Sequence, residues 1–188
     1  MNPDYFIILL AVALSLDCFS ISLITSIYKC PDIQKASKLA LVLAFFQALM
    51  FLAGWFLGKW IFSMLGSAEA MIASSIVIVI GIKKLFAAFS LKHDERSFNI
   101  DLNIILFGLA IATSIDSFIT SLGSEYLGIA IKKQIIFIYI LSVIFSLAGS
   151  YTGKKLVCKT CPKISIVIGG IIMLFLGGYK FLLLLKIF

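Results

Sequence analysis

The stretch ALSLDCFSISL, residues 13–23, places one aspartate, Asp17, in a run of otherwise apolar, thiol and hydroxyl side chains. A similar stretch, ATSIDSFITSL, occupies residues 112–122 and centres on Asp116. The two share Ala, Ser, Asp, Phe, Ser and Leu at equivalent positions. Biased composition explains repeated leucines, but it does not explain an ordered set of polar residues. The pattern therefore indicates an internal duplication.

Two further matches follow the aspartate stretches in the same order. They are LAGWFLGK at 52–59 with LAGSYTGK at 147–154, and GIKKLF at 81–86 with GGYKFL at 177–182. Because three motifs recur in order at nearly one spacing, we predict two repeats, residues 1–92 and 100–188. Together they form a single membrane domain, 1–188.

The composition predicts a membrane protein. Of 188 residues, 62% are hydrophobic and 13% charged, and the mean hydropathy is +1.14, more apolar than a soluble domain needs. Six apolar runs reach spanning length. They lie near 5–27, 37–61, 69–90, 102–124, 133–153 and 164–187. The first lacks the features of a cleaved signal, so we expect it to be retained. The predicted fold class is all-α integral membrane, with six transmembrane helices.

Three helices in each predicted repeat give the second repeat the opposite orientation in the membrane, because three is odd. The expected architecture is a 3+3 inverted repeat. Secondary transporters often have this architecture, with the binding site near the midplane where the repeats meet.

The net charge of +7 comes largely from alternate loops. The loops after the first, third and fifth runs hold Lys29, Lys35, Lys38; Lys83, Lys84, Lys92, Arg96; and Lys154, Lys155, Lys159, Lys163. The opposite side holds Lys59, Lys132, Lys133, Lys180 and Lys186. By the positive-inside rule, both termini face outward and the three basic loops are cytoplasmic. The charge thus sets topology, and we expect no nucleic-acid partner.

Asp17 and Asp116 both fall near the predicted mid-bilayer, where an ionised carboxylate costs about 2.5–3.5 kcal/mol on insertion scales. Such a group needs a partner, a cavity or a transported ion. Hydroxyl residues Ser20, Thr113 and Thr120 share a helix face with the aspartates, and Gln47 is a further amide in the second run. We predict these six residues as ligands of a divalent cation, because hard oxygen donors suit Mg²⁺, Ca²⁺ or Mn²⁺.

Two of these predictions have a structural alternative. Hydroxyl residues often pack helices together in membranes, and Gln47 could equally form a hydrogen bond between helices. The pairs Gly54/Gly58 and Gly149/Gly153 are four residues apart, so each lies on one helix face. We interpret these glycines as packing positions where another backbone approaches closely.

The motifs SLDCFSIS, FQALMFLAGWFLG and AIATSIDSF resemble those of the MntP-type manganese efflux pumps, and the resemblance covers nearly the whole chain. It implies a bacterial inner-membrane exporter that carries Mn²⁺ out of the cytoplasm and is not an enzyme. It also implies that Asp17 and Asp116 lie in the cation path, and that Gln47 occupies a position where relatives carry Gln or Glu. Mn²⁺ would be cargo, so no resident cofactor is expected.

Alternatives to this function remain. Cys30, Cys158 and Cys161 fall on the predicted cytoplasmic side, and thiols there would favour export of Zn²⁺ or Cd²⁺. The spelling ALSLD also resembles the YtaF-type sporulation membrane proteins, which suggests a non-transporting scaffold. Two intramembrane aspartates are also found in aspartyl proteases, although neither Asp here follows a Gly-x-Gly motif.

The repeat-equivalent Lys84 and Lys180 lie several residues inside their predicted helices. Their side chains either extend to the membrane interface, or one of them approaches an aspartate and takes the place of the cation. A single chain could enclose the site, or the glycine faces could join two protomers. We therefore expect a monomer or a homodimer.

Overall fold

The computed structural model describes six segments of the chain, and each is almost entirely helical. The segments are residues 3–29, 32–62, 69–90, 103–124, 131–155 and 161–185. Their helices are α1 (Pro3–Lys29), α2 (Ile33–Phe62), α3 (Glu69–Ser90), α4 (Asn103–Leu122), α5 (Ile131–Lys155) and α6 (Cys161–Leu185). Each begins and ends within a few residues of its predicted run, so the all-helical fold class is confirmed.

Within the described segments, α1, α2, α3, α5 and α6 are long and apolar enough to cross a membrane. The remaining helix, α4, has 20 residues, or about 30 Å of helix, and the apolar stretch among its described side chains is Leu106–Leu122. The prediction of six spans is therefore confirmed for five helices.

The helix boundaries follow from local chemistry. Pro3 and Pro162 lie in the first turns of α1 and α6, where a missing backbone N–H removes no intrahelical hydrogen bond. Before α2, the Asp32 carboxylate accepts a hydrogen bond of 2.8 Å from the backbone N–H of Ile33. Capping of this kind satisfies one of the N–H groups left unpaired at a helix start.

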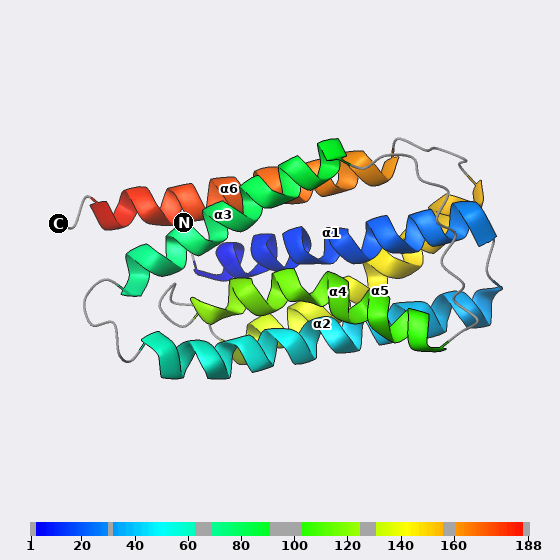
Figure 1. Cartoon of the computed structure of the whole chain (residues 1–188), viewed down its shortest axis with the longest axis horizontal. Coiled ribbons are helices and arrows are strands. Elements are labelled where there is room, and N and C mark those ends of the chain that lie inside the picture. Colours follow the sequence, from blue (N-terminus) through cyan, green and yellow to red (C-terminus); the bar gives the residue numbers. More distant parts are fainter. Residues whose placement is uncertain are drawn as a thin grey trace.

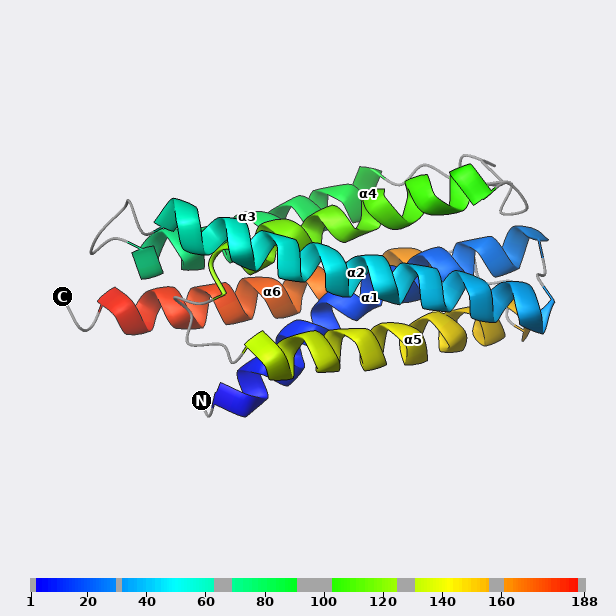
Figure 2. The ribbon, with the colours of Figure 1, turned by 90° about the horizontal axis from the view of Figure 1, so that it is seen from below.

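The helices form one elongated bundle (Figures 1 and 2). Helix α1 packs mainly against α5 and α6, α2 packs against α4 and α5, and α3 packs against α6. The consecutive pairs α1–α2 and α3–α4 share few contacts. Tertiary packing therefore joins the two halves of the chain more closely than it joins neighbours in sequence.

The start of α1 and the end of α6 lie at the same end of the bundle (Figures 1 and 2). The end of α1, the start of α2 and the adjoining ends of α3 and α4 and of α5 and α6 lie at the other end (Figure 1). The described helix ends that flank the three predicted basic connections therefore share one end of the bundle. Which end faces the cytoplasm stays a prediction.

A cluster of buried side chains holds the bundle together, and large apolar side chains cover its outside. The buried set includes Leu10, Leu14, Phe51, Ile138 and Met173. The exposed set includes Phe45, Phe56, Phe86, Phe89 and Phe175. Apolar exposure on this scale marks a surface that contacts lipid. Helices can present such a surface because each one satisfies its own backbone hydrogen bonds.

Glycines on α2 allow a close approach to α4. A Cβ atom at Gly54 would collide with the Phe118 backbone oxygen, and one at Gly58 would collide with the Leu122 backbone oxygen. No side chain larger than hydrogen fits there without moving a helix. The packing role predicted for this pair is confirmed.

Glycines on α5 have the same relation to α1. A Cβ atom at Gly149 would lie 2.5 Å from the Phe19 backbone oxygen, and one at Gly153 would lie 2.8 Å from the Leu23 backbone oxygen. Both distances are shorter than real Cβ contacts. This pair is therefore also confirmed as a packing element.

The assignment of Lys83 and Lys84 to a cytoplasmic loop is wrong, because both lie within α3. The predicted run, 69–90, already contained both lysines, and the error was to count them with the loop that follows it. Removing them from the loop count leaves the basic excess on the same side. Cys30 and Cys158 lie outside the described residues, as does the side chain of Cys161.

Candidate cation site

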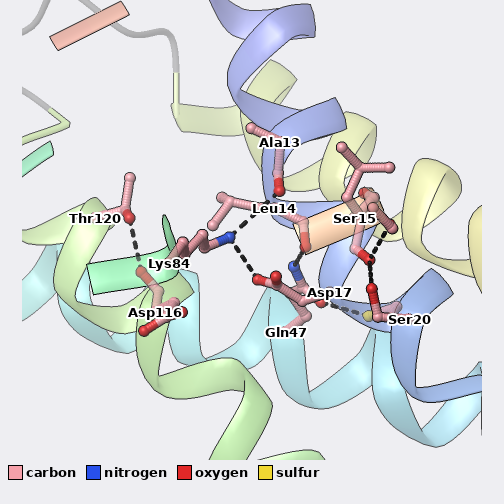
Figure 3. A network of polar contacts seen from close by, with 12 residues as sticks. Ala13, Leu14, Ser15, Asp17, Ser20, Gln47, Lys84, Asp116 and Thr120 are labelled. Atoms are coloured by element: carbon pink, nitrogen blue, oxygen red, sulfur yellow. Dashed lines mark hydrogen bonds and ion pairs between the residues drawn. The ribbon is translucent and has the colours of Figure 1, made fainter. Parts of the chain in front are cut away.

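Asp17 lies in the middle of α1 and forms an ion pair with a buried lysine of α3. The Lys84 Nζ atom is 2.6 Å from Asp17 Oδ2, and the two side chains are 3% and 14% exposed (Figure 3). Nζ also donates to the Ala13 backbone oxygen at 3.4 Å. The ammonium group therefore contacts two oxygens presented by neighbouring turns of α1.

Asp116 on α4 forms an ion pair with the preceding lysine of α3. The Lys83 Nζ atom is 2.7 Å from Asp116 Oδ1, and the side chains are 59% and 19% exposed. Successive residues of a helix point about 100° apart, so adjacent lysines reach different partner helices. Two adjacent lysines of α3 thus form ion pairs with the two aspartates among the predicted cation ligands.

The two ion pairs form one group. Asp17 interacts electrostatically with Asp116 and Lys83 as well as with Lys84. In Figure 3, Lys84 extends toward Asp17, and Asp116 lies on α4 beside it. We call Asp17, Asp116, Lys83 and Lys84 the charge cluster. In their ionised forms its two anions and two cations cancel.

Gln47 connects α2 to α1 beside the charge cluster. Its Nε2 atom donates to the Leu14 backbone oxygen at 2.8 Å, and its Oε1 atom accepts from Cys18 Sγ at 2.6 Å (Figure 3). The side chain is fully buried. The alternative that Gln47 forms a hydrogen bond between helices is confirmed. These two bonds hold the Gln47 amide against the part of α1 that carries Asp17.

Ser20 is directed toward α6. Its hydroxyl donates to the Leu16 backbone oxygen at 3.0 Å and to the Pro162 backbone oxygen at 3.3 Å. From α6, the Ser165 hydroxyl donates to the same Leu16 oxygen at 3.1 Å. Ser20 therefore links α1 to α6 in this conformation, and no hydrogen bond joins it to Asp17.

The hydroxyls of α4 bond to their own helix. Thr113 donates to the Leu109 and Ala110 backbone oxygens, both at 3.0 Å, and Thr120 donates to the Asp116 backbone oxygen at 2.7 Å. Such bonds leave lone pairs on each hydroxyl oxygen. The two threonines lie within about one turn of Asp116, one before it and one after it.

Sequence reasoning missed Lys83 as a partner of Asp116, and it left the role of Lys84 open. The available signal was a pair of adjacent lysines inside the apolar run 69–90, equal in number to the intramembrane aspartates. The alternative that a lysine approaches an aspartate is confirmed for Lys84. Lys180 instead lies over the Phe6 ring, 5.3 Å from its centroid.

No group of three or more His, Cys, Asp and Glu side chains suitable for a metal ion occurs within the described segments. A cation bound here would need neutral oxygens in addition to the two carboxylates. A groove of about 430 Å³ lies beside the Lys83–Asp116 pair. Its walls are mostly apolar, with Val79 of α3, Ile119 of α4 and Phe181 of α6 among them, and its polar members are Ser75 and Lys83.

A family model described as "Putative manganese efflux pump" matches residues 30–182. This chain belongs to the manganese efflux pump family. Relatives named as MntP pumps include one from Bacteroides thetaiotaomicron, 32% identical over 180 residues, or 93% of each chain. Another, from Rippkaea orientalis, is 32% identical over 89% of this chain and 90% of its own. A third, from Methanosarcina acetivorans, is 30% identical over 90% of this chain and 91% of its own. No solved structure matches the chain.

Membership of the manganese efflux pump family makes this chain a multi-pass membrane protein and a transporter rather than an enzyme. The aspartyl protease alternative is therefore excluded. Relatives come from bacteria and from archaea, so location in a bacterial inner membrane stays a prediction.

Proposed function

We propose that this chain exports Mn²⁺ from the cytoplasm across the cell membrane, with Asp17 and Asp116 as the anionic ligands. The observation that carries the proposal is the charge cluster, which brings two intramembrane carboxylates from different helices into one electrostatic group. Ionisable residues at membrane depth are costly, and they mark ion pathways in transporters. The names of the relatives supply the identity of the cation.

The proposed ligand set suits a hard divalent cation. Two carboxylates offset its charge, and neutral oxygens complete the shell, as Mn²⁺ prefers. We propose Ser20, Gln47, Thr113 and Thr120 as candidates for these neutral oxygens, since the three hydroxyls lie about one turn from an aspartate. In this conformation their hydrogens are donated to backbone carbonyls, and Gln47 Oε1 accepts from Cys18.

The transport mechanism we propose is alternating access between two inverted repeats. Support comes from the way the proposed repeats pack. The first helix of each repeat packs on the second helix of the other, α1 on α5 and α4 on α2. The contacts match in detail, because Gly149 meets Phe19 and Gly54 meets Phe118, which are equivalent positions in the repeated stretches. Because α3 packs on α6 and α1 packs on α5, the moving units we propose are helix pairs drawn from both repeats, and their relative movement would expose the site alternately on each side.

The α1–α6 and α3–α4 interfaces are equivalent in the proposed repeat, but the helices of the first pair are packed together more extensively. The α1–α6 interface is extensive, is crossed by the Ser20 and Ser165 hydrogen bonds and borders a smaller groove of about 270 Å³, whereas α3 and α4 share few contacts beside the 430 Å³ groove. Lys83 lines this groove with 59% of its side chain exposed. An ammonium at membrane depth faces water rather than lipid. We therefore propose that the groove is the access path open in this conformation.

The proposed orientation places both termini outside the cell and the basic connections in the cytoplasm. The paired arrangement of helix ends in Figure 1 is compatible with it, because the described helix ends that flank the three predicted basic connections share one end of the bundle. Cargo would then enter the site from the basic end during export.

The test is protection of a manganese-sensitive, exporter-deficient strain by plasmid-borne variants at matched protein levels. Asp116→Asn is the cleaner variant, because its partner Lys83 is exposed, and Asp17→Asn is the second. Both should abolish protection. The control Asp32→Asn makes the same substitution at the exposed start of α2 and should protect fully. Protection by both site variants would contradict the proposed site.

A second candidate cargo is a softer divalent cation, Zn²⁺ or Cd²⁺. The observation favouring it is the thiol of Cys18, which is buried next to Asp17 and bonded to Gln47. Growth of the same strains on Mn²⁺, Zn²⁺, Cd²⁺ and Mg²⁺ separates the candidates. Rescue from Zn²⁺ or Cd²⁺ but not Mn²⁺ would favour the softer cargo, and rescue from none would favour a non-transporting scaffold protein.

A further inference from the structure

We propose that Lys84 is a tethered cation: its ammonium occupies the Asp17 half of the site and is displaced when a divalent cation binds. This inference rests on the proposed function and adds a residue that controls occupancy. Its basis is the position of Nζ, 2.6 Å from the Asp17 carboxylate and 3.4 Å from the Ala13 carbonyl. A carboxylate and a carbonyl oxygen converging on one point are the groups that a hard cation takes.

Charge balance requires the displacement. The two ionised aspartates and two ammonium groups of the charge cluster already cancel. A divalent cation added with both lysines in place would leave an excess of two positive charges inside the membrane, which is strongly unfavourable. At least one lysine must therefore move away from its aspartate when the cation binds.

The two lysines differ in how they can move. The Lys83 side chain is 59% exposed and can swing into the groove by rotating its own bonds. The Lys84 side chain is 3% exposed, so no open path is available to its ammonium group. Removing Lys84 from Asp17 requires α3 to shift relative to α1.

Helix α3 is packed to move together with α6. A Cβ atom at Gly81 of α3 would lie 2.8 Å from Leu174 and 3.1 Å from the Gly170 backbone oxygen of α6. A Cβ atom at Gly177 of α6 would lie 2.7 Å from Ile78 of α3. Because backbones this close resist sliding independently, displacement of Lys84 couples occupancy of Asp17 to the position of the α3–α6 pair.

The experiment measures Mn²⁺ binding to the purified full-length protein in lipid nanodiscs by loss of the free-ion electron paramagnetic resonance signal. The same preparations are tested for efflux from vesicles. Lys84→Gln should lower the dissociation constant for Mn²⁺ by about tenfold or more, because a charged hydrogen bond no longer competes. Efflux should fall, since no tethered cation replaces the metal when it leaves.

Two variants separate displacement from a general charge effect. Lys84→Arg keeps the positive charge. Its dissociation constant for Mn²⁺ should stay within about threefold of that of the original protein, a smaller change than the tenfold one expected for Lys84→Gln. Lys155→Gln removes a lysine at the end of α5, which lies over Tyr151, and should leave the affinity unchanged. Equal tightening in Lys84→Gln and Lys155→Gln would overturn the proposal, as would unchanged affinity in Lys84→Gln.

Folding is controlled with Lys84→Met, which keeps an unbranched apolar chain, and with the paired variant Asp17→Asn/Lys84→Met. If Lys84→Gln and Lys84→Met both fail to fold while the paired variant folds, Lys84 is a permanent structural partner and the proposal is wrong. If the unaltered protein binds Mn²⁺ but Lys84→Gln binds no tighter, only this inference fails. If no variant binds Mn²⁺ and none confers protection, the proposed function fails with it.

Discussion

The repeated aspartate motif lies in two different environments in this molecule. Around Asp17 the bundle is closed: the partner Lys84 is buried, and hydrogen bonds from Ser20 and Ser165 cross the α1–α6 interface. Around Asp116 it is open: the partner Lys83 is exposed, and α3 and α4 barely touch. The comparison shows that two similar sequences acquire different surroundings from the helices beside them.

The difference comes mostly from a single helix. Helix α3 supplies both lysines, so the cation at Asp17 and the cation at Asp116 are fixed to the same rigid element. Helix α6 carries the repeat-equivalent Lys180, yet this residue contacts Phe6 instead of Asp116. An asymmetry of this kind is compatible with the alternating-access mechanism proposed above, in which this structure is one of two conformations.

The largest expected effect is on stability when Asp17 loses its charge. Asp17→Asn leaves the buried Lys84 ammonium without its anion, and removing one partner of a buried pair costs about 3–5 kcal/mol. Asp116→Asn should cost no more than about 1 kcal/mol, because Lys83 is exposed. Reversible unfolding of both variants in detergent checks this difference. Equal losses would show that burial does not distinguish the halves.

Next in size is the effect of filling the glycine contacts. Gly54→Ala and Gly149→Ala should each destabilise the protein by about 1–3 kcal/mol, since the new methyl group overlaps backbone of α4 or α1. Gly108 has no atom within 4 Å of the added methyl group, so Gly108→Ala should be neutral or slightly stabilising. The same unfolding measurement applies. A much larger cost at only one contact would break the proposed equivalence of the repeats.

A smaller difference should appear in water access. In a background with the four native cysteines replaced by serine, Ser75→Cys lies in the α3–α4 groove and Ser20→Cys in the closed α1–α6 interface. A hydrophilic thiol reagent should modify Ser75→Cys at least about tenfold faster, a free-energy difference in access of about 1.4 kcal/mol. Mass spectrometry of timed samples gives the rates. Faster labelling at position 20 would reverse the open and closed assignments.

The smallest expected effect concerns the hydrogen bonds across the closed interface. Ser20→Ala with Ser165→Ala removes two bonds between α1 and α6, each worth about 0.6 kcal/mol in membranes. Ser75→Ala removes only a bond within α3, to the Met71 carbonyl, and should change stability less. Unfolding curves measured side by side decide the point. No loss in the double variant would mean that packing alone closes the interface.

Much of the fold could be predicted from the sequence, because long apolar runs have few structures open to them. The membrane excludes unpaired backbone, so each run had to become a helix, and all six helices lie where the runs predicted them. The glycine pairs were also predictable, since a four-residue spacing of small residues has one main use in membranes.

The candidate site was only partly predictable. Asp17 and Asp116 stood out because carboxylates are rare at membrane depth, and Gln47 stood out for a similar reason. Lys83 did not, because a lysine near a helix end is ordinarily assigned to the interface, and for Lys84 contact with an aspartate was one of two alternatives. That Ser20 faces α6 rather than Asp17 depended on the packing of α6, which no local pattern encodes.

The sequence alone determined that the chain is helical and apolar, and it singled out two aspartates in similar stretches of its apolar runs. Those properties follow from residue types and spacing, which act along a single helix. Only the tertiary structure decided which lysine meets which aspartate, which interface is closed and where Gln47 bonds. The physical reason is that ion pairs and hydrogen bonds act over a few ångströms, so they depend on which helices become neighbours, and α1 and α3 are far apart in the chain.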